Sequence, residues 1–172
     1  EQFANVDGGC RTPCSQASQL NYGSKERSGG VYAMATLSSA LGELNVGLRA
    51  EHTNQIYTML QHFRNMGQVG EQSYWDYLPS ASVKWTPTKK MNVRLSYYRS
   101  INRPGFYEIV PYQIQGEEYQ EKGNPELKRA RIDNIDLRWE WFPSSTEQIL
   151  AGVFYKYLKN PIEQVFVTSD GK

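Results

Sequence analysis

The sequence predicts an all-β protein, an antiparallel meander of about six long strands. Three observations predict it. Apolar and polar residues alternate with a period of two, short turns separate paired stretches while long connections separate the pairs, and aromatic residues gather near the strand ends. A period of two is typical of strands because successive side chains point to opposite faces of a sheet.

The clearest hairpin covers residues 77–100. Alternate positions carry apolar side chains: Ala81, Val83 and Trp85 in its first half, then Met91, Val93, Leu95 and Tyr97 in its second. Residues 86–90 break the pattern and contain Pro87, which is typical of a turn. A register with Val83 opposite Val93 and Trp85 opposite Met91 keeps both faces of the hairpin pure, so we expect this register.

The same alternation places the remaining strands. We expect strands near residues 31–41, 44–53, 77–86, 91–100, 131–142 and 148–158, which form three hairpins within a β-barrel segment spanning residues 31–167. Residues 1–30 are interpreted as a polar loop or tail, and residues 168–172 as the cut end of a loop in a fragment of a longer chain. Residues 54–73 and 101–129 are interpreted as long connections.

This layout places every short turn at one end of the sheet and every long connection at the other. Bacterial outer-membrane barrels sort their connections in this way, with short turns facing the periplasm. Each expected strand has about 10–12 residues, enough to cross a bilayer when tilted. The sequence therefore predicts a section of a transmembrane β-barrel.

Aromatic residues form two groups along the expected strands. Trp85, Trp139, Trp141 and Phe142 lie near the short turns, whereas Tyr32, Tyr74, Trp75, Tyr77, Tyr97, Tyr98, Tyr155 and Tyr157 lie near the long connections. Aromatic girdles at the two membrane–water interfaces would have this arrangement. A preference of aromatic residues for strands explains their number without explaining the two levels.

The polar face carries charges of both signs, which cannot face lipid. Its members are Arg49, Glu51, Lys84, Arg94, Asp136, Arg138 and Glu140. They could line a water-filled lumen or contact a plug inside it, or they could belong to a sheet with one face in solvent.

Other functional classes find little support in the sequence. The net charge of +1 does not favour nucleic-acid binding, and no phosphate-binding glycine motif is present. The two histidines, His52 and His62, have no nucleophile or carboxylate at the spacing of a catalytic site, so we expect neither an enzyme nor a metal site nor a cofactor. Cys10 and Cys14 could form a disulfide in an oxidising compartment.

Four motifs in order resemble one family. YYRSINRPGFYEIVP at 97–111 resembles the "S-Y-S-R-x-x-x-R-P-x-F-x-E-L-x-P" signature of TonB-dependent outer-membrane receptors, and GNPELK at 123–128 resembles their "G-N-P-x-L-K-P-E" segment, with Arg129-Ala130 in place of the final Pro-Glu. LNVGLRAEHT at 44–53 and YKYLKNPI at 155–162 match strands of these receptors.

The resemblance implies a parent protein in the bacterial outer membrane, with a barrel of about twenty-two strands and an N-terminal plug. The plug contacts TonB, and the receptor imports an iron chelate, cobalamin, glycan or peptide. Membrane lipid and TonB are then the expected partners, the latter through a plug domain that this segment does not contain. The sequence does not identify the nutrient.

Two sets of residues are candidates for the functional site. A structural role is predicted for the family motif, in which Arg103 and Glu108 could pair at the base of the loop: Arg103, Pro104, Glu108, Pro111, Gly123, Asn124, Pro125 and Leu127. Ligand contacts could come from side chains in the loops, namely Tyr74, Trp75, Arg64 and Tyr119.

Two other functions remain open at this point. The chain could be a soluble β-sandwich whose long loops bind a ligand, or part of a passive barrel without energy coupling. In the isolated fragment, the cut strands near Val31 and Tyr157 would leave free edges. We expect these edges to be covered by self-association or by refolding of the loops over them.

Overall fold

The computed structural model describes residues 22–60, 69–115 and 120–166. Several residues considered above lie outside these ranges, namely Cys10, Cys14, His62, Arg64 and Tyr119. The chain divides into two compact units. Unit 1 comprises residues 1–29, 52–75 and 104–127, and unit 2 comprises residues 30–51, 76–103 and 128–172.

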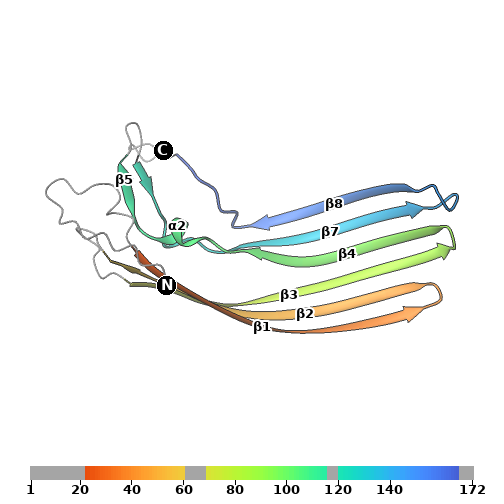
Figure 1. The fold of residues 1–172 in the computed structure, drawn as a ribbon, viewed down its shortest axis with the longest axis horizontal. Helices are drawn as coiled ribbons and strands as arrows, with labels where there is room; N and C mark the ends of the chain where they lie inside the picture. The colour runs from red at the N-terminus through yellow and green to blue at the C-terminus, as the bar shows by residue number, and fades with distance from the viewer. Residues whose placement is uncertain (1–21, 61–68, 116–119, 167–172) are drawn as a thin grey trace. The chain divides into compact units, whose positions relative to one another are not determined.

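One six-stranded sheet dominates the structure, with strand order β1-β2-β3-β4-β7-β8 (Figure 1). Its strands are β1 (Tyr22–Ser39), β2 (Gly42–Met59), β3 (Val69–Thr88), β4 (Met91–Asn102), β7 (Ala130–Trp141) and β8 (Ile149–Lys159). Neighbours in the sheet are neighbours among these six in the sequence, and the pairs from β3 to β8 are antiparallel. The predicted all-β meander is confirmed.

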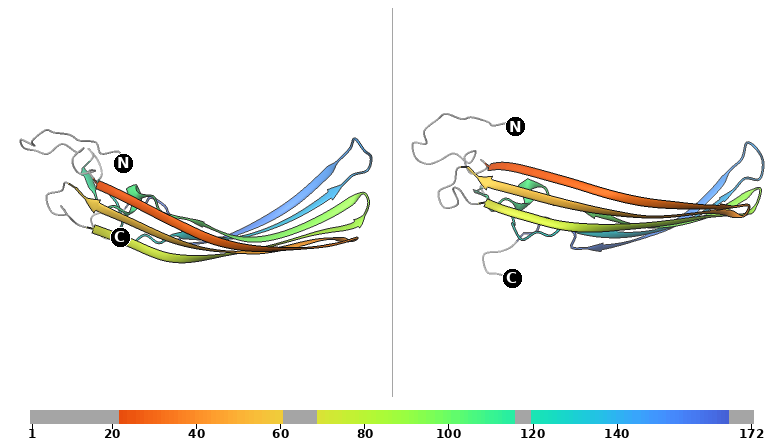
Figure 2. Two further views of the ribbon diagram at one scale, coloured as in Figure 1. Left: turned by 60° about the horizontal axis from the view of Figure 1, so that its bottom comes forward. Right: turned by 90° about the horizontal axis from the view of Figure 1, so that it is seen from below.

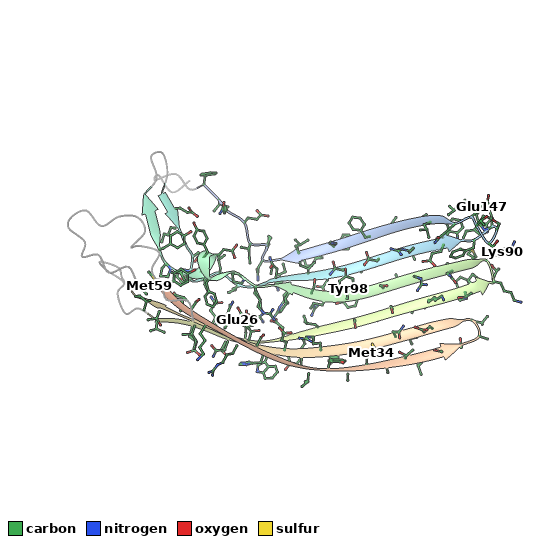
Figure 3. All side chains as sticks on the ribbon, in the orientation of Figure 1. Glu26, Met34, Met59, Lys90, Tyr98 and Glu147 are labelled. Atoms are coloured by element: carbon green, nitrogen blue, oxygen red, sulfur yellow. The ribbon has the colours of Figure 1, made fainter. Side chains whose placement is uncertain are left out.

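The short turns lie beside one another within unit 2, as predicted (Figure 1). The amide of Thr86 donates to the carbonyl of Leu41 at 2.8 Å, and the amide of Phe142 donates to the carbonyl of Lys90 at 2.8 Å. The ammonium of Lys90 also donates to the carbonyl of Pro143 at 2.9 Å. Figure 3 shows Lys90 and Glu147 at this end of the strands.

Rows of side chains across unit 2 confirm the predicted separation of the two faces. One row contains Val83, Leu95, Leu137 and Val153 on adjacent strands, and another contains Lys84, Arg94, Arg138 and Gly152. Val93 lies two residues from Leu95 and therefore shares the apolar face. Figure 2 shows these strands side by side from two further directions.

The predicted register of the β3–β4 hairpin is wrong by two residues. Val83 lies opposite Leu95 and Trp85 lies opposite Val93. The strands continue to Thr88 and Met91, and the register shifts between Trp85 and Thr88. Pro87 lies in this irregular stretch; because proline has no amide hydrogen for the ladder, it is tolerated at a bulge. The turn is therefore shorter than the expected break at 86–90.

The first three strands extend well beyond their predicted bounds. β1 and β2 have 18 residues each and β3 has 20. Residues 22–30 therefore belong to a strand and not to a polar tail, and residues 54–59 and 69–73 of the expected connection are also strand. These extensions carry polar side chains on both faces, so a search for an apolar face does not find them.

The connection from β4 to β7, residues 103–129, has its own local structure. It contains a single helical turn, α2 (Phe106–Ile109), and a two-stranded hairpin of β5 (Gln113–Gln115) and β6 (Gln120–Lys122). Within the described ranges, no helix has the length and apolar character required to span a membrane.

Candidate functional site

A buried core forms in unit 1, where the connection packs on the end of β2. Its members are Tyr57, Met59, Ile109, Val110 and Tyr112, and Tyr22, Phe106 and Leu127 pack against them. Met59 is 1% exposed and Ile109 is 0% exposed. Glu51, Thr53 and Gln55 occupy alternate positions of β2 on the same face as Tyr57 and Met59, and they are also buried. The connection therefore covers the inner, polar face of this strand.

Two glutamine side chains hold the connection on the inner face. The amide nitrogen of Gln55 donates to the carbonyl of Pro104 at 3.4 Å, and that of Gln72 donates to the carbonyls of Pro125 at 3.0 Å and Leu127 at 3.2 Å. These bonds pair carbonyls of an irregular segment with strand side chains. The bond from Gln55 to Pro104 is buried, and a buried carbonyl needs such a partner because an unpaired buried polar group is costly.

Gln55 is itself fixed by two further groups. Its amide nitrogen donates to the carboxylate of Glu26 at 3.0 Å, and its oxygen accepts from the hydroxyl of Tyr74 at 3.4 Å. Three strands, β1, β2 and β3, thus contribute to one hydrogen-bonded group beneath the connection.

Within the connection, the motif residues make local bonds. The carboxylate of Glu108 accepts from the amide of Gly105 at 2.7 Å and caps α2. The amide of Asn124 donates to the carbonyl of Glu108 at 2.7 Å, and its side chain accepts from the amide of Glu126 at 2.9 Å. Gly123 lies against Val110, where a Cβ would stand 1.9 Å from the carbonyl oxygen, so only glycine fits there.

Arginines flank the connection at both ends, and each reaches a buried carboxylate. Arg103 pairs with Glu51, which is 8% exposed and also bonds to Arg49 at 2.6 Å. The predicted pair of Arg103 with Glu108 is therefore replaced by one with β2. The physical reason is that Glu108 is needed at the start of α2, whereas Glu51 is a buried anion that requires cations.

At the other end, Arg129 pairs with Asp76, which is 2% exposed, and Arg131 lies 3.5 Å from the same carboxylate. The second oxygen of Asp76 has no hydrogen-bond partner among the described residues. Asp76 and Glu51 lie on adjacent strands, so each end of the connection is tied to its own strand of the sheet.

The predicted ligand contacts Tyr74 and Trp75 lie in β3 and not in a loop. Tyr74 lies on the inner face with Gln55, while Trp75 points the opposite way and is 55% exposed. The ring of Trp75 lies tilted against that of His52, with ring centroids 5.0 Å apart. The structure does not bring these two aromatic side chains together on one face. Arg64 and Tyr119 fall outside the described ranges.

Sequence reasoning missed the residues that hold the connection, namely Gln55, Gln72 and Asp76. The sequence signal for them is that alternation with a period of two continues past the apolar part of the strands. In β3 it reaches positions 72, 74 and 76 of the inner face. Glu51 was placed on the polar face, but its partner Arg103 is 52 residues away in sequence, a pairing that alternation alone does not reveal.

The aromatic levels are confirmed in part. Trp85, Val93 and Trp139 form one row of the apolar face, and Trp139 stacks on Trp141. Tyr97, Ile135 and Tyr155 form a row towards the long connections. The predicted girdle residues Tyr32, Tyr74 and Tyr98 instead lie at alternate positions of the polar face; Tyr98, for example, lies opposite Ser80 and Asn134.

The polar face of unit 2 brings cations together. Lys84, Arg94 and Arg138 are neighbours across three strands, and Arg94 bonds to Glu140 at 3.1 Å. Glu140 also accepts from Asn92 at 3.1 Å. Like charges in adjacent cross-strand positions are unfavourable unless water or an anion compensates them, as the interior of a barrel allows. Among described residues, no group of three His, Cys, Asp or Glu side chains could hold a metal ion.

The apolar face, the charged opposite face and the sorted turns define an antiparallel segment of a membrane-spanning β-barrel. The sequence matches the profile of the outer membrane protein beta-barrel family over residues 3–172, and the chain belongs to that family. This membership places it in the bacterial outer membrane.

A solved structure gives a related comparison. The crystal structure of the siderophore receptor PirA from Pseudomonas aeruginosa is similar with a TM-score of 0.48 and 18% sequence identity. The alignment covers 88% of this chain and 36% of that receptor, so the chain spans about a third of its length. A search of curated protein sequences found no significant match.

Proposed function

We propose that this chain forms part of a TonB-dependent receptor that imports a nutrient across the outer membrane. The observation that carries the proposal is the packing of residues 104–127 on the inner face of β2 and β3 through Gln55 and Gln72. A barrel whose inner face is covered in this way suits a receptor that opens for cargo better than an open pore. The four ordered sequence motifs support the same function.

The partners follow from this proposal. Lipid would cover the apolar face, and TonB would act through a plug domain outside residues 1–172. The proposed cargo classes are those that the family implies: an iron chelate, cobalamin, a glycan or a peptide. Tyr74, Arg64 and Tyr119 remain candidate ligand contacts, whereas Trp75 lies on the face opposite to Tyr74. Aromatic or cationic side chains suit both sugar rings and anionic chelates.

The proposal is tested by deleting the gene that encodes this chain and measuring growth on limiting iron, cobalamin, glycan or peptide sources. Loss of growth on one nutrient, together with the same loss in a TonB-deficient strain, supports energy-coupled import. Growth that depends on the gene but not on TonB would instead identify a passive barrel. The upstream sequence gives a second check, because a plug of about 120–150 residues, an ordinary domain size, should precede the barrel.

The isolated segment should self-associate, because its outer strands β1 and β8 each have a free edge within the described sheet. Sedimentation of residues 1–172 in detergent-free buffer should show oligomers or aggregates. A monodisperse monomer would contradict this proposal without affecting the import function of the whole protein.

A further inference from the structure

A groove lies on unit 1 and is formed by β1 and β2. It has a volume of about 430 Å³. Its lining residues are Lys25, Arg27, Ser28, Gly29, His52, Asn54 and Ile56. The groove is open at Gly29, where a Cβ would meet nothing within 4 Å.

Cross-strand bonds identify the face on which the groove opens. Thr36 donates to Asn45 at 2.6 Å, and Gln55 donates to Glu26 at 3.0 Å, so even-numbered β1 side chains share the inner face with odd-numbered β2 side chains. Lys25 and Arg27 therefore lie on the opposite face, together with His52 and Asn54. Figure 3 labels Glu26, which separates the two cations along β1.

The opposite face is the one that turns towards lipid. On β2 it carries Leu44, Val46, Leu48 and Ala50, and His52 is the next residue on the same side. On β1 the corresponding positions after Arg27 and Gly29 are Val31, Ala33, Ala35 and Leu37. Alternation along each strand thus assigns the groove residues to the same side as the apolar positions.

The two cations of the groove form no ion pair with a described carboxylate. Among the described residues, no carboxylate lies within 4.0 Å of the charged nitrogens of Lys25 or Arg27. Glu26 is turned to the inner face, where it bonds to Gln55. Glu71 accepts a hydrogen bond from Asn54 at 2.8 Å, which orients that amide beside the two cations.

An aromatic pair fixes the other wall. The ring of His52 lies 5.0 Å from that of Trp75, and its Nε2 atom lies 3.0 Å from the hydroxyl of Ser73. Tryptophan prefers the membrane interface, where its ring is apolar and its N–H reaches water. Trp75 thus indicates that this part of the lipid-facing surface lies at headgroup level.

We propose that this groove binds the phosphorylated headgroup of an anionic lipid in the outer leaflet, with Lys25 and Arg27 as the phosphate-binding residues. A guanidinium and an ammonium bind phosphate through charge-assisted hydrogen bonds, and basic groups at a membrane surface attract anionic headgroups. The apolar side chain of Ile56 in the groove and the ring of Trp75 beside His52 favour a lipid over free phosphate, because they can pack against its acyl chains.

The proposal is tested on the full-length protein in neutral detergent, by native mass spectrometry with diphosphoryl lipid A as the probe. The double variant Lys25→Gln/Arg27→Gln should bind the lipid about thirtyfold more weakly, since two cations are lost at the headgroup. The matched control Lys84→Gln/Arg138→Gln removes the same charges from the inner face and should bind as the wild type does.

A charge-conserving variant, Lys25→Arg/Arg27→Lys, should retain binding, and it keeps the test decisive if the neutral variant folds poorly. Inorganic phosphate should compete far more weakly than the lipid. Equal affinity of the wild type and the neutral variant would overturn the proposal, as would equal loss in the inner-face control. Binding of inorganic phosphate as tightly as lipid A would overturn the lipid assignment.

Discussion

The two units differ in how their apolar side chains are covered. In unit 2, Val83 is 42% exposed, Leu137 is 42% exposed and Val153 is 68% exposed, whereas in unit 1 Met59 is 1% exposed and Val110 is 0% exposed. Unit 1 covers its core with its own connection, but unit 2 leaves its apolar face for lipid. The apolar side chains of one sheet can therefore be covered by lipid along one part of the strands and by the protein's own chain along another.

The largest expected effect concerns Asp76, where the connection rejoins the sheet. Asp76→Ala leaves Arg129 without its buried partner and Arg131 without a nearby anion. Removing one partner of a buried ion pair costs about 3–5 kcal/mol, and the partial exposure of Arg131 places the expected loss near the lower bound. Urea unfolding of the full-length barrel in lipid vesicles measures this change.

The control is Asp136→Ala, which removes a carboxylate from the same face and has no ion pair among the described residues. Its unfolding free energy should change by no more than about 0.5 kcal/mol, as for an ordinary surface substitution. Similar losses for both variants would show that Asp76 has no special part in holding the connection.

The difference between the units also explains how much of the fold the sequence predicts. The faces of unit 2 could be predicted because lipid demands apolar residues at every second position, as Val83, Leu95 and Leu137 show. The register could not, because it depends on a bulge near Pro87 that keeps both faces unchanged. A shift of two residues preserves alternation, so alternation does not detect it.

Unit 1 was harder to predict for a different reason. Its strand ends carry polar residues such as Thr53, Gln55 and Gln72, which resemble loop residues in isolation. They form strands because the connection covers them and supplies carbonyl partners from far along the chain. The motif residues Gly123 and Pro125 could be recognised in the sequence, but the close approach of Gly123 to Val110 and the bond from Gln72 to Pro125 could not.

The second prediction concerns neighbouring residues on opposite faces of β4. Leu95→Arg places a cation on the lipid face and should destabilise the barrel by about 2–4 kcal/mol if this row lies near the bilayer midplane. Ser96→Arg places the same side chain opposite Asp136 on the inner face and should have little effect. Unfolding in vesicles compares the two, and equal losses would contradict the assignment of the lipid-facing side.

The third prediction compares two glycines of unit 1. Gly123→Ala would place a Cβ 1.9 Å from the backbone oxygen of Val110, so the connection must shift, with an expected cost of about 1–3 kcal/mol. Gly23→Ala, with nothing within 4 Å of its Cβ, should be close to neutral. Limited proteolysis within residues 104–127 should speed up for Gly123→Ala alone; cleavage at unchanged rates would show that this close approach is not required.

The smallest effect concerns Tyr112 in the connection, whose hydroxyl donates to Glu121 at 3.0 Å. Burial, followed by hydrogen bonding with Tyr107 and Glu121, raises the pKa of Tyr112 above its ordinary value of 10.0. The neutral phenol is therefore favoured in the folded state. Its stabilising contribution is fully present below about pH 10 and decreases above that pH, because the unfolded chain can ionise there while the folded chain cannot.

Tyr112→Phe should lower the unfolding free energy at pH 8 by about 1 kcal/mol, the usual contribution of one hydrogen bond. Between pH 8 and pH 11 the unfolding free energy of the wild type should then fall by about 1 kcal/mol more than that of this variant. Each pH unit over which only the unfolded chain ionises corresponds to about 1.4 kcal/mol. Tyr107→Phe removes the more exposed phenol on the same carboxylate and should retain the alkaline loss. An alkaline loss of equal size in the wild type and Tyr112→Phe would show that water reaches this phenol, and that the connection covers unit 1 less completely than its packing indicates.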